Sequence, residues 1–279
     1  MAVAEALVSF VASSLAQKGE GLHLTGRDEH KLKAVTEMSK SLTEATSIID
    51  LGSFPKAGVA MIFGISGALV EALSSIDSVG HVVGFSRKTS PSIDLMDEAS
   101  LERAATLAAG MGELRLVIDA TGFLHDDRQR PEKSWRQLDA GNLARSFALN
   151  AIGPALIMKH VLPLLPRSGK AVFATLSARV GSIGDNRLGG WYSYRASKAA
   201  LNQLVRTAAV ELARRSPEGI CIALHPGTVA TALSAPFSAT ELDVHTPAEA
   251  SRQLLAVVDK LPVEANGGFF DWRGRPVPW

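Results

Sequence analysis

The chain has 279 residues, of which 46% are hydrophobic and 20% are charged, and its formal net charge is +1. This composition predicts a globular protein with a substantial core, and the near-neutral charge gives no electrostatic reason to expect binding to nucleic acid or to an anionic membrane. Cys221 is the single cysteine. No internal disulfide can therefore form, and we expect a reducing, cytoplasmic location.

Residues 1–55 are predicted to be an N-terminal extension. Their apolar start, AVAEALVSFVASSLA (2–16), lacks a basic region and contains Glu5, which argues against a targeting signal. The order helix end, glycine, strand and basic residue in residues 14–32 recurs in residues 72–90. We interpret the extension as a partial repeat of a Rossmann helix–strand unit without a phosphate-binding loop; a coincidence of α/β patterning is the alternative.

Residues 56–279 are predicted to form the main domain, in which short apolar runs alternate with amphipathic helical stretches. The runs that predict strands are 58–64, 80–86, 114–122, 170–177, 219–227 and 267–272. This alternation predicts an α/β fold, a Rossmann-type doubly wound parallel sheet of about seven strands with helices on both faces. Ligands of such sheets bind at the carboxyl ends of the strands, so the loops that follow the strands should carry the functional residues.

The turn after the first of these strands, FGISGALVEAL, contains Gly64 and Gly67 with Ser66 between them. In dinucleotide-binding turns, glycines allow a tight turn and let the backbone approach a pyrophosphate. Ala68 and Val70 stand where such turns usually have glycine. The turn in isolation is therefore a weak sign of a cofactor site, and a strand–helix turn without a nucleotide is the alternative.

The turn after the second strand, GFSRKTS, contains Ser86, Arg87 and Lys88 and no acidic residue. An acidic side chain at this place would accept a hydrogen bond from the ribose 2′-hydroxyl of NAD, whereas a guanidinium pairs with the 2′-phosphate of NADP. The sequence therefore favours NADP over NAD. A solvent-exposed Arg-Lys turn without a ligand is the alternative.

The stretch WYSYRASKAALN (191–202) contains both tyrosines of the chain, Tyr192 and Tyr194. Only Tyr194 has a lysine at i+4, Lys198, which an α-helix places on the same face. An ammonium about 5 Å from a phenol favours the phenolate by roughly 3 kcal/mol at an effective dielectric of about 20, and so lowers the phenol pKa. Tyr194 is therefore predicted to donate a proton to a carbonyl oxygen that receives a hydride at its carbon. Tyr192 is predicted to line the substrate cleft.

Two further polar residues precede this helix. Ser177 ends the strand KAVFATLS and is predicted to donate a hydrogen bond to the substrate oxygen, with Ser182 as the alternative donor. Asn150 lies in a predicted helix that Gly153 and Pro154 should disturb.

Asn150, Ser177, Tyr194 and Lys198, in this order and on these elements, resemble the catalytic residues of the short-chain dehydrogenase/reductases. The resemblance covers residues 57–279 and is most detailed toward the C-factor and sniffer-type carbonyl reductases, through SARVGSIGDNRLGGWYSYRASKAALN and HPGTVATALS. It implies that backbone groups freed near Asn150 anchor a water leading to Lys198, and that Lys198 also donates to ribose hydroxyls.

The same resemblance implies contacts with the rest of the cofactor. It assigns Asp94 to the adenine, Gly122 to a close backbone approach, Pro226 and Gly227 to the turn under the nicotinamide, and Val229 and Thr231 to the carboxamide. Gly122 ends DATG, where the family has an Asn-Ala-Gly turn, so that asparagine is lost here. We interpret His225 as a packed strand residue.

Together these features predict an NAD(P)H-dependent oxidoreductase that reduces an aldehyde or ketone to an alcohol, or catalyses the reverse reaction. A nucleotide-binding signalling protein or pseudo-enzyme on the same fold is the alternative, because Ala68 and Val70 alter the glycine turn. The seven histidines show no metal-ligand spacing, so we expect no metal. The expected partners are a small carbonyl or alcohol substrate and further copies of the chain in a homodimer or homotetramer, with no nucleic acid and no membrane.

Overall fold

The computed structural model describes residues 49–64, 67–231, 234, 236 and 244–279. Its central feature is a sheet with the strand order β2-β1-β3-β4-β5-β8, in which all neighbouring strands are parallel. The strands are β1 (Gly58–Phe63), β2 (Val79–Phe85), β3 (Leu114–Asp119), β4 (Ala171–Leu176), β5 (Gly219–His225) and β8 (Phe269–Asp271). The predicted doubly wound parallel fold is confirmed, and among the described residues this sheet has six strands where about seven were expected.

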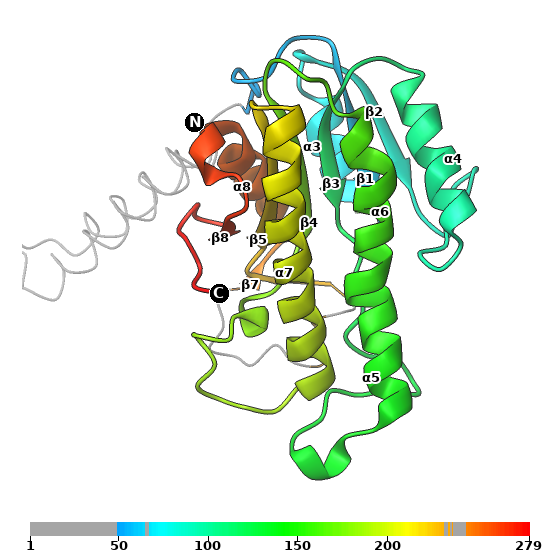
Figure 1. Ribbon diagram of the computed structural model, residues 1–279, viewed down its shortest axis with the longest axis vertical. Coiled ribbons are helices and arrows are strands. Elements are labelled where there is room, and N and C mark those ends of the chain that lie inside the picture. The colour runs from blue at the N-terminus through cyan, green and yellow to red at the C-terminus, as the bar shows by residue number, and fades with distance from the viewer. Residues whose placement is uncertain (1–48, 65–66, 232–233, 235, 237–243) are drawn as a thin grey trace, which may run out of the picture. The chain divides into compact units, whose positions relative to one another are not determined.

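The described residues form six α-helices, and helices lie on both faces of the sheet (Figure 1). They are α3 (Gly67–Ser74), α4 (Glu98–Ala109), α5 (Ala140–Phe147), α6 (Gly153–Val161), α7 (Tyr192–Arg215) and α8 (Pro247–Lys260). Side chains alternate along β1, so Val59, Met61 and Phe63 pack in the core cluster with α4, α6 and α7. Ala60 and Ile62 pack with α3 and α8 on the other face. Burial on both faces explains why the strands are continuous apolar runs.

The helical stretch from Ala140 to Leu164 contains a π turn, Ala148–Ile152, between α5 and α6. Gly153 and Pro154 follow this turn directly, and it is the helix disturbance that they predicted. By length and composition the stretch could cross a membrane. Its parts instead pack against α7, α4 and β3, so we interpret it as a core helix of this domain.

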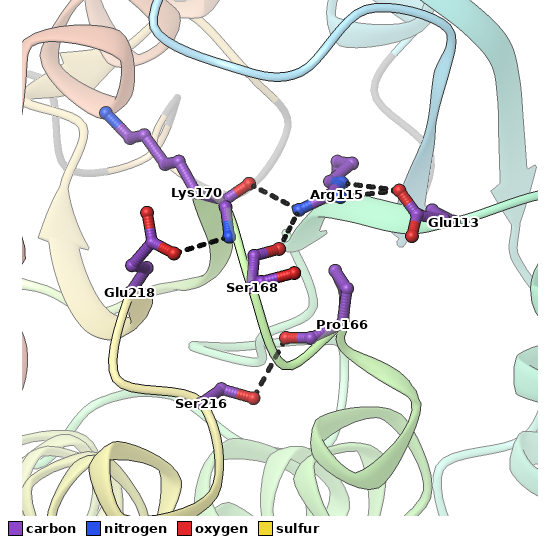
Figure 2. Close-up of polar contacts among 8 residues, drawn as sticks. Glu113, Arg115, Pro166, Ser168, Lys170, Ser216 and Glu218 are labelled. Atoms are coloured by element: carbon purple, nitrogen blue, oxygen red, sulfur yellow. Dashed lines mark hydrogen bonds and ion pairs between the residues drawn. The ribbon is translucent and has the colours of Figure 1, made fainter.

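A buried arginine ties together the loops at the amino-terminal edge of the sheet (Figure 2). Arg115, in β3, donates to the carbonyl of Ser168 over 2.7 Å and forms an ion pair with Glu113. Glu218, just before β5, accepts a hydrogen bond from the backbone of Gly169, just before β4. The starts of three neighbouring strands are therefore held at fixed positions, which in turn fixes their carboxyl ends.

Residues 49–55 belong to the same compact unit as the sheet. Leu51 and Phe54 are buried in the core cluster under α3 and α8, and Ser53 hydrogen-bonds with Asp259 in α8 through its backbone N–H and its hydroxyl. The main domain therefore includes these residues as well as the predicted 56–279. Residues 1–48 lie outside the described residues, so the partial-repeat interpretation stays a prediction.

Candidate active site

Three of the predicted site residues meet where the carboxyl ends of β3 and β4 face the first half of α7. Lys198, which is buried, donates through Nζ to the carbonyl of Leu176, the last residue of β4. A Cβ atom added at Gly122 would lie 3.6 Å from Lys198 Nζ and 3.7 Å from Asn150 Oδ1. Residues that are far apart in the chain, Gly122, Asn150 and Lys198, are thus side by side in the structure.

Asn150 lies in the middle of the π turn and is fully buried. Its Oδ1 accepts from the backbone N–H of Phe123 over 2.7 Å, and its Nδ2 donates to the Phe123 carbonyl and to Ser197 Oγ. Ser197 in turn donates to the carbonyl of Tyr194. Asn150 therefore holds the loop after β3 and contacts α7 within one turn of the predicted proton donor. The water that the resemblance implies next to Asn150 stays a prediction.

Ser177 follows β4 directly, and its hydroxyl donates to Oδ1 of Asn202 over 2.7 Å. Asn202 is a buried residue that the sequence reasoning missed, although it lies on α7 at i+4 from Lys198. Its Nδ2 lies 3.4 Å from the carbonyl of Gly181, which fixes the orientation of the amide. To donate to a substrate oxygen, as predicted, the Ser177 hydroxyl has to turn away from Asn202.

Burial sets the acidity of the two groups at the centre of the site. Desolvation raises the pKa of the Tyr194 phenol to about 12. It lowers the pKa of Lys198 to about 8, against the opposing charge of Asp119. The lowering of the phenol pKa that was expected from Lys198 is not found, because desolvation of the phenol shifts its pKa in the opposite direction. At neutral pH the phenol is protonated, as a proton donor must be.

Asp119, the last residue of β3, is a second site residue that the sequence reasoning missed. Its carboxylate is fully buried and accepts hydrogen bonds from Thr121 N, Thr121 Oγ1 and Thr175 Oγ1. Burial raises its pKa, while these hydrogen bonds and the charge of Lys198 act in the opposite direction. Asp119 therefore gives the buried Lys198 ammonium a compensating negative group.

The glycine turn after β1 keeps its tight part. Gly64 has φ +73°, and a Cβ there would lie 3.0 Å from the backbone of Ala120, so only glycine fits without strain. Gly67 is the first residue of α3, and a Cβ added there would meet no atom within 4 Å. Val70 packs partly buried in the core cluster with α3 and α8. Of the two side chains that depart from the usual pattern, Val70 is therefore accommodated in the core, and Ala68 is half-buried in α3. Ser66 lies outside the described residues.

The basic turn after β2 presents its cations to solvent. Ser86 accepts from the backbone N–H of Lys88 and Thr89 donates to the Ser86 carbonyl, which closes the turn. Arg87 and Lys88 are exposed, and neither side chain is paired within the part of the chain that the structure describes. Asp94 is also exposed, and its Oδ1 accepts from the backbone of Met96.

The turn after β5 leads directly into β6 (Thr228–Val229), which pairs with β7 (Val244–His245) in a small parallel sheet. Pro226 is half-buried, and Gly227 has φ +77° and packs against His245 and Trp272, so a side chain there would clash. The Val229 carbonyl accepts from Ser234 Oγ, and the exposed Thr231 lies within 3.4 Å of the same hydroxyl.

Three remaining predictions concern residues at the rim of this region. His225 ends β5 half-buried, and burial lowers its pKa to about 4, which agrees with a packed neutral imidazole. Ser182 is buried and accepts from the backbone of Asp185, so its hydroxyl is used inside its own loop. Tyr192 is the half-buried first residue of α7.

Comparison with known protein families gives one match over more than half of the chain. The statistical model of a family described as "Enoyl-(Acyl carrier protein) reductase" matches residues 92–256. Among curated proteins, "C-signal" of Myxococcus xanthus is 40% identical over 144 residues, which cover 51% of this chain and 81% of that protein. The "1-hydroxy-2-glutathionyl-2-methyl-3-butene dehydrogenase" of Rhodococcus sp. (strain AD45) is 34% identical over 190 residues, covering 68% and 79% respectively.

Solved structures with the same fold include carbonyl reductases. The carbonyl reductase Sniffer of D. melanogaster superposes with a TM-score of 0.68 at 22% identity, over 80% of this chain and 100% of that one. The NADPH-bound carbonyl reductase from chicken fatty liver superposes with a TM-score of 0.69 at 23% identity, also over 80% of this chain and 100% of that one. A carbonyl reductase from Pseudomonas aeruginosa PAO1 gives 0.60 at 26% identity, again over 80% and 100%.

Proposed function

Because the chain belongs to the short-chain dehydrogenase/reductase family of oxidoreductases, we propose that it reduces the carbonyl group of an aldehyde or ketone to an alcohol with NADPH. The observation that carries this proposal is the place of Lys198. Its ammonium is buried at the carboxyl edge of the sheet and bonds to one protein carbonyl, that of Leu176. A lysine has three donor positions, so within the described part of the chain two remain for a ligand that approaches beside Gly122.

The chain's own residues then perform the proton chemistry. Tyr194 donates the proton of its hydroxyl to the carbonyl oxygen as negative charge develops there, and it becomes a phenolate. Lys198, with a pKa of about 8, is a stronger acid than the phenol, with a pKa of about 12, so proton transfer back to Tyr194 is downhill. Ser177 turns from Asn202 to donate to the same substrate oxygen.

The residues present fit a nicotinamide dinucleotide. When bound, the reduced nicotinamide supplies the hydride that adds to the carbonyl carbon. Gly67, where an added Cβ would meet no atom within 4 Å, would let a pyrophosphate approach the amino end of α3, where the helix dipole favours negative charge. Arg87 and Lys88 are exposed and have no paired side chain in the described parts of the chain, so they could pair with a 2′-phosphate, which is why we propose NADPH rather than NADH.

Titration of the protein with NADPH and with NADH, followed by the fluorescence of the reduced nicotinamide, tests the cofactor. We expect NADPH to bind at least tenfold more tightly, since a charge-assisted pair contributes about 1.5–3 kcal/mol. A panel of aldehydes and ketones, with the alcohol product identified, then tests the reaction. Absence of NADPH binding would contradict the proposal as a whole. NADPH binding without turnover of any carbonyl would favour the nucleotide-binding alternative instead.

The outer faces of α6 and α7 offer a surface for a second copy of the chain. A groove of about 410 Å³ lies between them, lined by apolar residues such as Met158, Leu204 and Ala208, with Lys159 and Glu211 also lining it. None of the site residues lines this groove. We propose that this groove forms the contact between the two copies of a homodimer. Analytical ultracentrifugation tests it: the unmodified protein should sediment as a dimer and Leu204→Asp as a monomer.

A further inference from the structure

Glu132 is a buried acid, and among the described residues its hydrogen-bond partners lie at the beginning of α7. It is 3% exposed and belongs to the loop between β3 and α5. Its carboxylate accepts from the backbone N–H of Ser193 over 3.1 Å and from the Ser193 hydroxyl, and its carbonyl accepts from the backbone N–H of Trp191. The N-cap residue of α7, Trp191, makes no side-chain capping bond. The Glu132 side chain therefore caps the helix in its place, although Glu132 and Ser193 are 61 positions apart in the chain.

The turn that enters α7 has an unusual backbone. Gly189, Gly190 and Trp191 have φ values of 64°, 64° and 52°, so three consecutive residues are left-handed. Tryptophan rarely adopts this conformation, and it persists only where the surroundings hold it. Glu132 holds the turn on one side. On the other side Arg195 donates to the carbonyl of Gly190 over 3.0 Å.

This turn determines what lies next to the predicted proton donor. The rings of Trp191 and Tyr194 meet edge to face, with their centroids 6.2 Å apart. Ser193, which carries both contacts to the Glu132 carboxylate, directly precedes Tyr194 in the chain. A change in the turn would therefore move both the phenol and the ring beside it.

We propose that Glu132 is a positioning residue for Tyr194, acting through the left-handed Gly189–Trp191 turn and the first turn of α7. The proposal rests on the proposed function, in which Tyr194 is the proton donor. Glu132 touches neither substrate nor cofactor in this scheme; it sets the direction of the phenol. A displacement of about 1 Å of a catalytic group can cost on the order of 10²-fold in rate.

The first experiment compares Glu132→Gln with Glu113→Gln. In Glu132→Gln the side-chain amide has one acceptor oxygen, whereas the carboxylate uses two oxygens to accept from Ser193. We therefore expect kcat to fall about 10- to 100-fold, while the dissociation constant for NADPH changes less than about twofold. Glu113 is the matched control, because its exposed carboxylate pairs with Arg115 at the opposite edge of the sheet. Its variant should leave both constants unchanged. Equal kcat values in the parent and Glu132→Gln would overturn the proposal.

Ser193→Ala keeps the test decisive if Glu132→Gln does not fold. It removes the hydroxyl contact and keeps the backbone contact, so we expect a smaller fall in kcat of the same kind. In the double variant the two falls in kcat should not add, because both substitutions disrupt the same contact between Glu132 and Ser193. Unchanged kcat in Ser193→Ala, or additive effects in the double variant, would count against the role of Glu132.

A second readout does not depend on turnover. The chain has two tyrosines, so Tyr192→Phe leaves Tyr194 alone. With 3-fluorotyrosine incorporated, fluorine NMR then gives one resonance, which Glu132→Gln should shift or split and Glu113→Gln should not. An unmoved resonance would refute the positioning role. A further outcome is that the protein shows no carbonyl reduction while its Tyr194 fluorine resonance still shifts in Glu132→Gln. That outcome would refute the proposed function, but Glu132 would still be shown to position Tyr194.

Discussion

The two ends of β4 hold two lysines in opposite ways. Lys170, just before the strand, donates to Ser53 Oγ and to the carbonyls of Asp259 and Leu261. Lys198, at the other end, donates to the carbonyl of Leu176. Burial lowers the pKa of both. The first lysine has used its three donor positions on the protein and is a structural link, whereas the second makes one such bond within the described residues, and in the proposed function its other donors bind a ligand. Under the proposed function, the number of protein hydrogen bonds thus distinguishes a structural lysine from a ligand-binding one.

The largest expected effect is at the carboxyl edge. Tyr194→Phe removes the proton donor and should lower kcat by about 10²- to 10⁴-fold, with the NADPH dissociation constant within a few-fold of the parent. Tyr192→Phe is the control and should keep kcat within an order of magnitude. Steady-state kinetics and fluorescence titration measure these values. Substantial turnover by Tyr194→Phe would make Tyr192 the first candidate for the acid.

The two lysines can be compared by the same substitution. Lys198→Met should lower kcat and NADPH affinity at least about tenfold, because it removes the ligand donors. Lys170→Met should leave kcat unchanged and lower the free energy of unfolding by about 1–3 kcal/mol, because Ser53, Asp259 and Leu261 lose a shared donor. Urea unfolding and kinetics on both variants separate the two outcomes. A loss of activity without a loss of stability in Lys170→Met would contradict the structural role of Lys170.

Arg87→Asp changes the cofactor end of the same edge. The carboxylate would repel the 2′-phosphate, so we expect the KM for NADPH to rise about 10- to 100-fold and the KM for NADH to change far less. Lys88→Gln, which removes a charge without adding one, should give an intermediate value. Equal changes for the two cofactors would mean that Arg87 is only a surface residue.

The lowered pKa of Lys198 predicts how activity and stability depend on pH. Reduction should decline as pH rises through about 8, where Lys198 loses its proton. From there up to the ordinary lysine pKa the unfolded chain binds more protons than the folded one, so the Lys198 contribution to the free energy of unfolding should rise with pH. In Lys198→Met this rise should be missing. Urea unfolding across that interval, in both proteins, measures the difference.

The smallest expected effect on the chemistry comes from truncation of the N-terminal extension. A protein that begins at Ile49 keeps Leu51, Ser53 and Phe54 and should bind NADPH like the full chain. One that begins at Pro55 loses two core side chains and should be less stable by several kcal/mol, at about 2–5 kcal/mol for each. It should still bind NADPH where circular dichroism shows it folded. A folded protein from Ile49 that no longer binds cofactor would contradict this.

Local pattern was enough to predict the parallel sheet, with Ser177 at the end of a strand and Tyr194 and Lys198 on one helix face, because parallel strands end at one edge and i+4 spacing defines a helix face. The grouping of Asn150 with these residues was implied by the family resemblance. Asn202 was within reach of the same spacing rule. Glu132 was not, because its partner Ser193 is 61 residues away and no local signal joins them.

The raised pKa of Tyr194 was missed for a similar reason. Its cause is desolvation by the folded surroundings, which the spacing of Tyr194 and Lys198 does not reveal.

The π turn at Ala148–Ile152 has a further consequence for how this helix can change over time. Successive residues of an α-helix are rotated by about 100° about the helix axis, so one added residue changes which side chains of the following helix face the core. Here α5 packs against α7, and α6 packs against α4, α7 and β3. Loss of a single residue from the turn would rotate one half against the other and present the wrong side chains to its neighbours. Variation in length is therefore tolerable in the loops at either end of this helical stretch and costly at its middle.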